Sequence, residues 1–122
     1  MDKTRVNYIV DEKNRIVVAE IDGCRYDALH ELNNKFIPNV TSGIGVIGDY
    51  ARSKFMMKDK YRAVAKCHEE DTWDAEFGKR VACAKLTDVY HRSLNKRLNL
   101  FSAKFSRIVY DVTSYLFDKS FK

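Results

Sequence analysis

The sequence predicts an α+β fold in which an antiparallel sheet of three or four strands packs against one long C-terminal helix or two consecutive helices. Three observations support this prediction: residues 1–29 alternate between apolar and polar side chains, residues 60–68 alternate again, and residues 74–118 follow a helical period without a proline. The chain has 122 residues, which suits a single domain with its own core. We expect β-hairpins in residues 1–29, an insertion with short helices in 30–58, a strand in 60–68 and a long helical region in 74–118.

The first candidate hairpin begins with the alternating run Val6–Val10. The polar loop Asp11–Asn14 would return this run onto Arg15–Ile21 as an antiparallel partner. Every second residue of the two strands would then share one apolar face, made of Val6, Tyr8, Val10, Val17, Ala19 and Ile21.

The dipeptide Asp22-Gly23 predicts a second hairpin, because a type I′ turn needs positive φ at both central residues. Such a turn would place Ile21 opposite Cys24 and Glu20 opposite Arg25. A shift of one residue would mix the apolar and polar faces, so this register is well specified.

The segment between the hairpins and the third strand is less regular. Residues 28–37 predict a short helix that Pro38 ends, and Tyr50–Met57 predicts another helical turn or two. Between them, Thr41–Gly48 is rich in small residues whose backbone amides could hold a phosphate. This stretch lacks the Gly-Lys-Ser/Thr end of a P-loop, so a plain loop is the simpler interpretation.

The strand at residues 60–67 carries small side chains on its inward face, among them Ala63 and Ala65. Small inward residues indicate that another element packs very close to this strand. Next in the chain, Asp71, Thr72 and Asp74 offer N-cap oxygens for the helical region that follows.

An apolar stripe runs along the helical region at heptad spacing; it consists of Leu94, Leu98, Phe101, Phe105, Ile108, Val112 and Tyr115. An unbroken helix of this region would be about 65 Å long at 1.5 Å per residue. That length exceeds one face of a globule of 122 residues. Either the region breaks near Ser93–Asn99 into two helices, or it projects into a partner subunit. We favour a break or kink, together with a homo-oligomer that forms through the stripe.

Composition limits the classes of function. Lys and Arg number 22 against 17 Asp and Glu, a net charge of +5, which mildly favours an anionic partner but is also common among small proteins. No run of 18 apolar residues exists, so we expect no contact with a membrane. The N-terminus lacks the apolar segment of a signal peptide, and three widely spaced cysteines indicate reduced thiols. A cytoplasmic location is therefore expected.

Cys67-His68 and the acidic residues after it carry side chains that serve elsewhere in catalysis and metal binding. Structural zinc sites use spaced ligand pairs, and neighbouring residues of a strand point to opposite faces, so neither a zinc site nor a Cys–His nucleophile is favoured. The carboxylates of Glu69, Glu70 and Asp71 are better explained by the start of a helix. We expect no catalytic residue, no metal and no cofactor, and hence no enzyme.

Basic residues interleaved with tyrosine and asparagine make the helical region the candidate binding surface. Arginine contacts phosphate, an aromatic ring stacks on a base, and a carboxamide reads a base edge. The same residues also suit a solvated helix face. The candidate ligand-binding set is Tyr90, Arg92, Asn95, Arg97, Asn99 and Arg107. The arginines would hold a pyrophosphate, Tyr90 would stack on adenine, and Asn95 or Asn99 would read its edge.

Residues 65–82 read AKCHEEDTWDAEFGKRVA. This segment resembles a pattern of small phage and prophage proteins, in which a strand ending in A-x-C-H-x-x-D precedes an aromatic residue, an aspartate and a helix with G-x-x-x-A. Within that group the chain is most similar to the phage anti-defence sponges that oppose the Thoeris system. The resemblance implies a homo-oligomer in the cytoplasm of the host bacterium. It would sequester a host immune signalling nucleotide, a cyclic ADP-ribose isomer, without degrading it.

Other function classes stay open at this point. A nucleic-acid or nucleoprotein-binding inhibitor, such as an anti-CRISPR or a protein that binds double-stranded RNA by its shape, would also use a sheet, helices and positive charge. A small enzyme is least favoured, because no nucleophile, base and third group are seen to converge.

Overall fold

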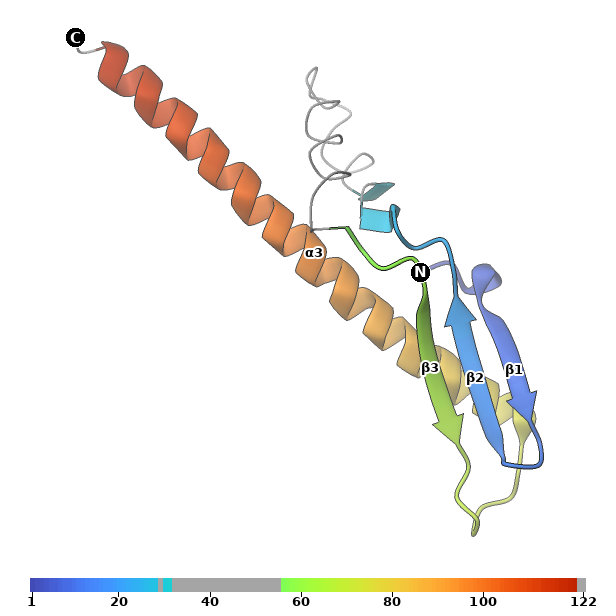
Figure 1. The fold of residues 1–122 in the computed structure, drawn as a ribbon. Coiled ribbons are helices and arrows are strands. Elements are labelled where there is room, and N and C mark those ends of the chain that lie inside the picture. Colours follow the sequence, from blue (N-terminus) through green and yellow to red (C-terminus); the bar gives the residue numbers. More distant parts are fainter. Residues whose placement is uncertain (29, 32–55, 121–122) are drawn as a thin grey trace.

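Three strands form an antiparallel sheet in the order β1-β2-β3, and one long helix, α3, covers one of its faces (Figure 1). The computed structural model describes residues 1–28, 30–31 and 56–120. The predicted α+β fold is confirmed. The elements are the 3-10 helix η1 (Lys3–Arg5), β1 (Asn7–Asp11), β2 (Ile16–Ile21), β3 (Tyr61–Lys66) and α3 (Ala75–Ser120).

The predicted hairpin of β1 and β2 forms, with Asp11 as the last residue of β1. Tyr8 pairs with Ala19, so the alternating apolar residues of the two strands share a face. Asp11 closes the loop, because its carboxylate accepts hydrogen bonds from the backbone N–H of Asn14 at 3.1 Å and from its side-chain amide at 2.7 Å. Arg15 completes the turn with a φ of 54°.

The hairpin predicted at Asp22-Gly23 is wrong, because β2 pairs with β3 and not with residues 24–28. Gly23 does adopt a positive φ of 72°, but the chain then leaves the sheet. The backbone N–H of Cys24 donates to the Asp59 carbonyl at 2.9 Å, and Arg5 binds the Asp22 carbonyl. The edge of β2 that this hairpin would have used is occupied by β3, which pairs with all six residues of β2.

Small residues let α3 lie very close to the sheet. A Cβ atom added to Gly78 would stand 2.7 Å from Cγ2 of Val17, a distance that real side chains essentially never show. Ala82, one turn later, is fully buried, and Ala63 and Ala65 of β3 are buried as well. The small inward side chains of β3 indicate such a close contact already in the sequence, and α3 is the element that makes it.

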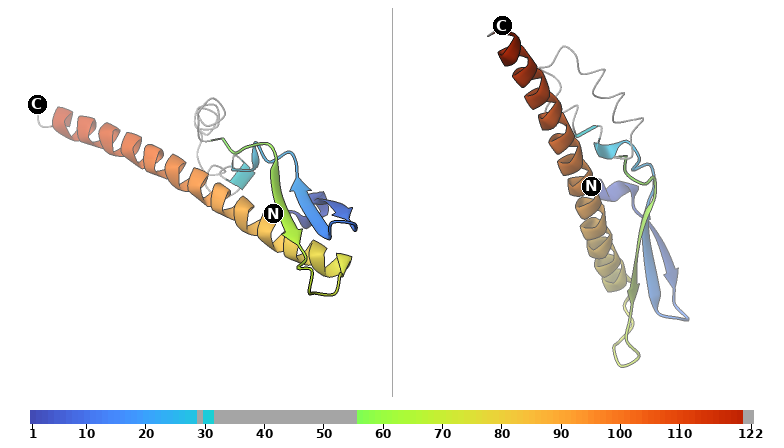
Figure 2. Two further views of the ribbon diagram at one scale, coloured as in Figure 1. Left: turned by 60° about the horizontal axis from the view of Figure 1, so that its bottom comes forward. Right: turned by 60° about the vertical axis from the view of Figure 1, so that its left-hand side comes forward.

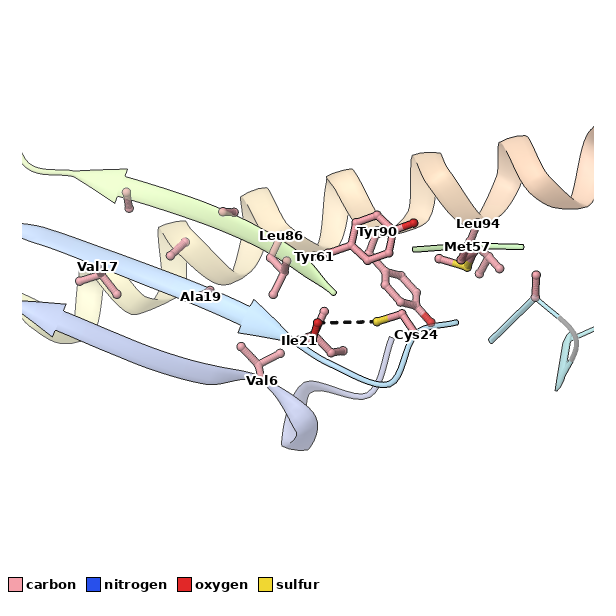
Figure 3. Close-up of a cluster of buried hydrophobic side chains, with 14 of the residues drawn as sticks. Val6, Val17, Ala19, Ile21, Cys24, Met57, Tyr61, Leu86, Tyr90 and Leu94 are labelled. Carbon is pink, nitrogen blue, oxygen red and sulfur yellow. Dashed lines mark hydrogen bonds between the residues drawn. The ribbon is translucent and has the colours of Figure 1, made fainter. Parts of the chain in front are cut away.

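The core lies between the sheet and the first half of α3 (Figure 3). Its largest fully buried side chains are those of Val17, Ile21, Cys24 and Leu86. Asp74 caps the helix: its Oδ1 accepts from the backbone N–H of Glu76 at 3.0 Å and of Phe77 at 3.3 Å.

The predicted break near Ser93–Asn99 is wrong, since α3 is a single helix of 46 residues, about 69 Å long. Its first half covers the sheet and its second half continues well beyond it (Figures 1 and 2). No proline or glycine occurs after Gly78, so nothing interrupts the backbone hydrogen bonds. The helix can reach this length without a break because it is not confined to the globule.

The elements predicted within the insertion at 30–58 fall mostly or wholly on residues outside the described ranges. They are the short helix over 28–37, the loop Thr41–Gly48 and the helical turns of Tyr50–Met57.

The contact between Gly78 and Val17 gives a direct stability test. Gly78→Val should lower the free energy of unfolding by about 2 to 3 kcal/mol, because the larger side chain would push α3 off the sheet. The control is Ala103→Val, which adds the same side chain at an exposed position of the same helix. Chemical denaturation measures both, and equal losses in the two variants would contradict the close contact.

Candidate functional site

The six predicted binding residues all lie on α3 but do not share one side of it. Tyr90 faces the sheet and is only 5% exposed. Arg97, two turns later, lies above Tyr90 on the same side and is half-buried. Arg92, Asn95 and Asn99 are spaced by three and four residues, so they form a common exposed stripe facing away from the sheet.

Tyr90 is a core residue, and its predicted role as a stacking platform is wrong. Its hydroxyl donates to Oδ2 of Asp27 at 2.5 Å, and its ring meets Tyr61 edge-on with centroids 6.0 Å apart. Burial, followed by the bond to Asp27, raises the pKa of Tyr90. Asp27 in turn pairs with Arg5, whose Nη1 lies 3.5 Å from Oδ1. The ring therefore ties α3 to the N-terminal region and is not accessible to a base.

The three predicted arginines are held apart from one another. Nη2 of Arg92 lies 2.8 Å from the Asp88 carboxylate, in an exposed pair within the helix. The Nε atom of Arg97 is buried and has no hydrogen-bond partner. Arg107 is exposed and lies about 15 Å further along the helix axis than Arg97. Within one chain these side chains do not enclose a ligand.

The segment of residues 67–74 serves as a strand-to-helix connection. Nη1 of Arg15 donates to the carbonyls of Glu69 at 3.3 Å and of Asp71 at 3.1 Å. The backbone N–H of Cys67 donates to the Arg15 carbonyl at 2.9 Å. Across the described residues, no three His, Cys, Asp or Glu side chains group as metal ligands do.

A basic recess lies elsewhere, between the N-terminal elements and the outer side of α3, with a volume of about 660 Å³. Three cationic side chains, Lys3, Lys79 and Arg80, border it together with one acidic side chain, Glu76. Tyr8 supplies an aromatic ring. The remaining lining residues are Cys83, Ala84 and Thr87.

Contacts around the recess hold its cationic groups in place. Nζ of Lys79 lies 3.3 Å from the Glu76 carboxylate and 5.9 Å from the centre of the Tyr8 ring. The guanidinium of Arg80 lies 5.7 Å from the Phe77 ring. A hydrogen bond with Cys83, together with partial burial, raises the pKa of Tyr8 to about 12, so its hydroxyl stays neutral at physiological pH. The recess therefore places the cationic groups of Lys79 and Arg80 close to the flat ring of Tyr8.

None of the residues that border the recess belongs to the predicted binding set. Lys79 and Arg80 lie in the basic helical region that the sequence indicates, whereas Lys3 and Tyr8 come from the N-terminal elements. Only the pairing of β1 with β2 brings Tyr8 beside α3, and no local pattern signals that contact.

The thiol of Cys24 does not supply a nucleophile. It is fully buried beside the Ile21 carbonyl, 3.8 Å from its oxygen (Figure 3). Burial, and then the charge of Asp27, raises the pKa of Cys24 to about 11, so the reactive thiolate is scarce at neutral pH.

No protein-family model, no curated protein and no solved structure matches this chain. Within the described part of the chain, no helix combines the length and apolar character that crossing a membrane requires.

The role assigned to Tyr90 can be tested by removing its hydroxyl alone. Tyr90→Phe should lower the free energy of unfolding by about 1 to 2 kcal/mol, because Asp27 loses a buried hydrogen bond. Tyr110→Phe is the control, since Tyr110 is 71% exposed on the same helix. Thermal and chemical denaturation measure both variants. Equal stability of the two would show that the bond to Asp27 contributes nothing.

Proposed function

We propose that this protein binds and sequesters an anionic nucleotide without converting it, and that the recess between Tyr8 and α3 holds the phosphates. The main support for the proposal is that three cationic residues border one recess, namely Lys3, Lys79 and Arg80. Lys and Arg are the side chains that proteins use to bind phosphate.

The charge and size of the recess suit a pyrophosphate. Three cationic residues against one acidic residue leave a balance of +2, which matches the two negative charges of a pyrophosphate bridge esterified at both ends, as in ADP-ribose. Its volume of about 660 Å³ lies within the usual range for small-molecule sites. The ion pair of Lys79 with Glu76 positions the ammonium group before a ligand arrives.

Sequestration fits these side chains better than catalysis does. Tyr8 carries a neutral hydroxyl, because the neighbouring Cys83 and partial burial raise its pKa. A general base would have to accept a proton near neutral pH, which a group with a pKa of about 12 does not favour. The recess therefore offers groups that bind phosphate but no activated nucleophile.

The resemblance of residues 65–82 to phage anti-defence sponges suggests which nucleotide to try first. A host immune signal of the cyclic ADP-ribose class carries the pyrophosphate that the recess suits. Under this proposal the protein would act in the cytoplasm of the host bacterium, and it would do so as a homo-oligomer. Exposed apolar side chains on the second half of α3 support self-association.

The test is calorimetric titration and thermal shift with cyclic ADP-ribose isomers and ADP-ribose. Arg80→Ala should weaken binding about tenfold or more, because it removes a charged hydrogen-bond donor from the recess. Arg92→Ala is the matched control, since Arg92 lies on the same helix outside the recess and pairs with Asp88. Mass spectrometry should recover the nucleotide intact. No shift at millimolar nucleotide, or equal loss in both variants, would contradict the proposal.

A second candidate is binding to nucleic acid, which the charge of α3 favours. Residues 79–107 contain eight basic residues and a single acidic residue, Asp88. Arg92, Asn95 and Asn99 share an exposed stripe that could contact phosphates and base edges. Binding of duplex RNA or DNA that weakens steeply with salt, and that Arg92→Ala impairs more than Arg80→Ala, would favour this function.

A further inference from the structure

A second hollow lies between the end of β3, the connection that follows this strand and the first turns of α3. Its volume is about 400 Å³, which is within the usual range for small-molecule sites. Trp73, Phe77 and Val81 supply large apolar side chains to its wall. We call this hollow the aromatic cavity. It shares no lining residue with the basic recess, so the phosphate site proposed above leaves it unused.

Two aromatic rings border the aromatic cavity. Trp73 is partly buried against the core, and its Cζ3 lies 3.9 Å from the place that a Cβ atom of Gly78 would take. Phe77 is 58% exposed, so a large apolar ring faces solvent here. In the described part of the chain these two rings make no contact with each other. Such rings are what proteins use to stack nucleobases, because every base has a π-face.

The charge of the aromatic cavity is opposite in sign to that of the recess. One cationic residue, Lys66, against the acidic residues Asp71 and Asp74 leaves a balance of −1, with His68 counted as neutral. The balance of the recess is +2. A phosphate is therefore attracted to the recess and repelled from the cavity, whereas an uncharged ring meets no such repulsion in the cavity.

The two hollows are neighbours on α3. Arg80 borders the recess and Phe77 borders the aromatic cavity. The guanidinium of Arg80 lies over the Phe77 ring, 5.7 Å from its centre. In a nucleotide the base and the first phosphate are joined through one ribose, so the sites that hold them must be adjacent. The contact between Arg80 and Phe77 provides this adjacency.

We infer that the aromatic cavity holds the base of the nucleotide whose phosphates lie in the recess, and that this base is a purine stacked on Phe77 and Trp73. A purine suits the cavity because its two fused rings offer more area for stacking than a pyrimidine does. The inference rests on the proposed function and narrows its ligand. Sugar phosphates and inorganic phosphates would fill the recess alone, whereas a purine nucleotide fills both hollows.

Fluorescence tests the base site without any phosphate. Trp73 is the single tryptophan of the chain, so its emission reports on the aromatic cavity. Adenosine should quench this emission until the site is saturated, with excitation at the red edge of the tryptophan band, where adenine does not absorb. Phe77→Leu should weaken the binding of adenosine and of ADP-ribose about tenfold, because it removes one stacking ring and keeps an apolar side chain.

Inorganic pyrophosphate tests the phosphate site without a base. Calorimetric titration should show that it binds the wild-type chain and the Phe77→Leu variant equally. Tyr110→Leu is the matched control, since it removes a ring that is 71% exposed on the same helix but outside the cavity. It should leave the affinities for adenosine, ADP-ribose and pyrophosphate unchanged.

The two sites can fail separately. Pyrophosphate binding without quenching by adenosine, or adenosine binding that Phe77→Leu leaves unchanged, would overturn the base site and leave the phosphate site standing. Adenosine binding that Phe77→Leu weakens, in a chain that does not bind pyrophosphate, would support the base site and overturn the recess as the phosphate site. A chain that binds neither probe would overturn both.

Discussion

The close contact between Gly78 and Val17 determines how the rest of the molecule is arranged. With no side chain at Gly78 and only methyl groups at Ala63, Ala65 and Ala82, the first half of α3 lies almost against the backbone of the sheet. A rigid helix that is fixed along its first turns has its direction fixed for its whole length. The second half of α3 is therefore carried past the end of the sheet (Figure 2), where Val109 and Val112 are about half exposed.

This arrangement assigns different tasks to different sides of one helix. The side toward the sheet is used for the core, with Tyr90 bonded to Asp27. A neighbouring side borders the recess with Lys79 and Arg80, next to Tyr8 of β1. Beyond the sheet, exposed apolar side chains such as Val112 make the surface through which we propose that copies of the chain associate. The proposed ligand site and this proposed surface lie on separate parts of α3.

Patterns within one element were predictable from the sequence. The first hairpin followed from alternation and a polar loop, and Asp74 capped α3 as its position indicated. Apart from the predicted break in α3, the failures depended on distant contacts. Asp22-Gly23 formed no hairpin because β3 pairs with β2, and the burial of Tyr90 follows from which side of α3 meets the sheet. The recess was missed for the same reason, since Lys3 and Tyr8 are far in the sequence from the α3 residues that they meet there.

The central claim is that α3 is one straight helix whose second half leaves the sheet. Electron spin resonance can measure the distance between two spin labels on α3, attached at Ala84→Cys and Ser106→Cys. The accessible native cysteines are removed by Cys67→Ala and Cys83→Ala. Dilution with unlabelled chain removes distances between copies. An unbroken helix predicts one narrow distribution near about 33 Å, from 22 residues at 1.5 Å each. A broad distribution centred below about 25 Å would mean that the helix bends between the labels, and it would contradict the account.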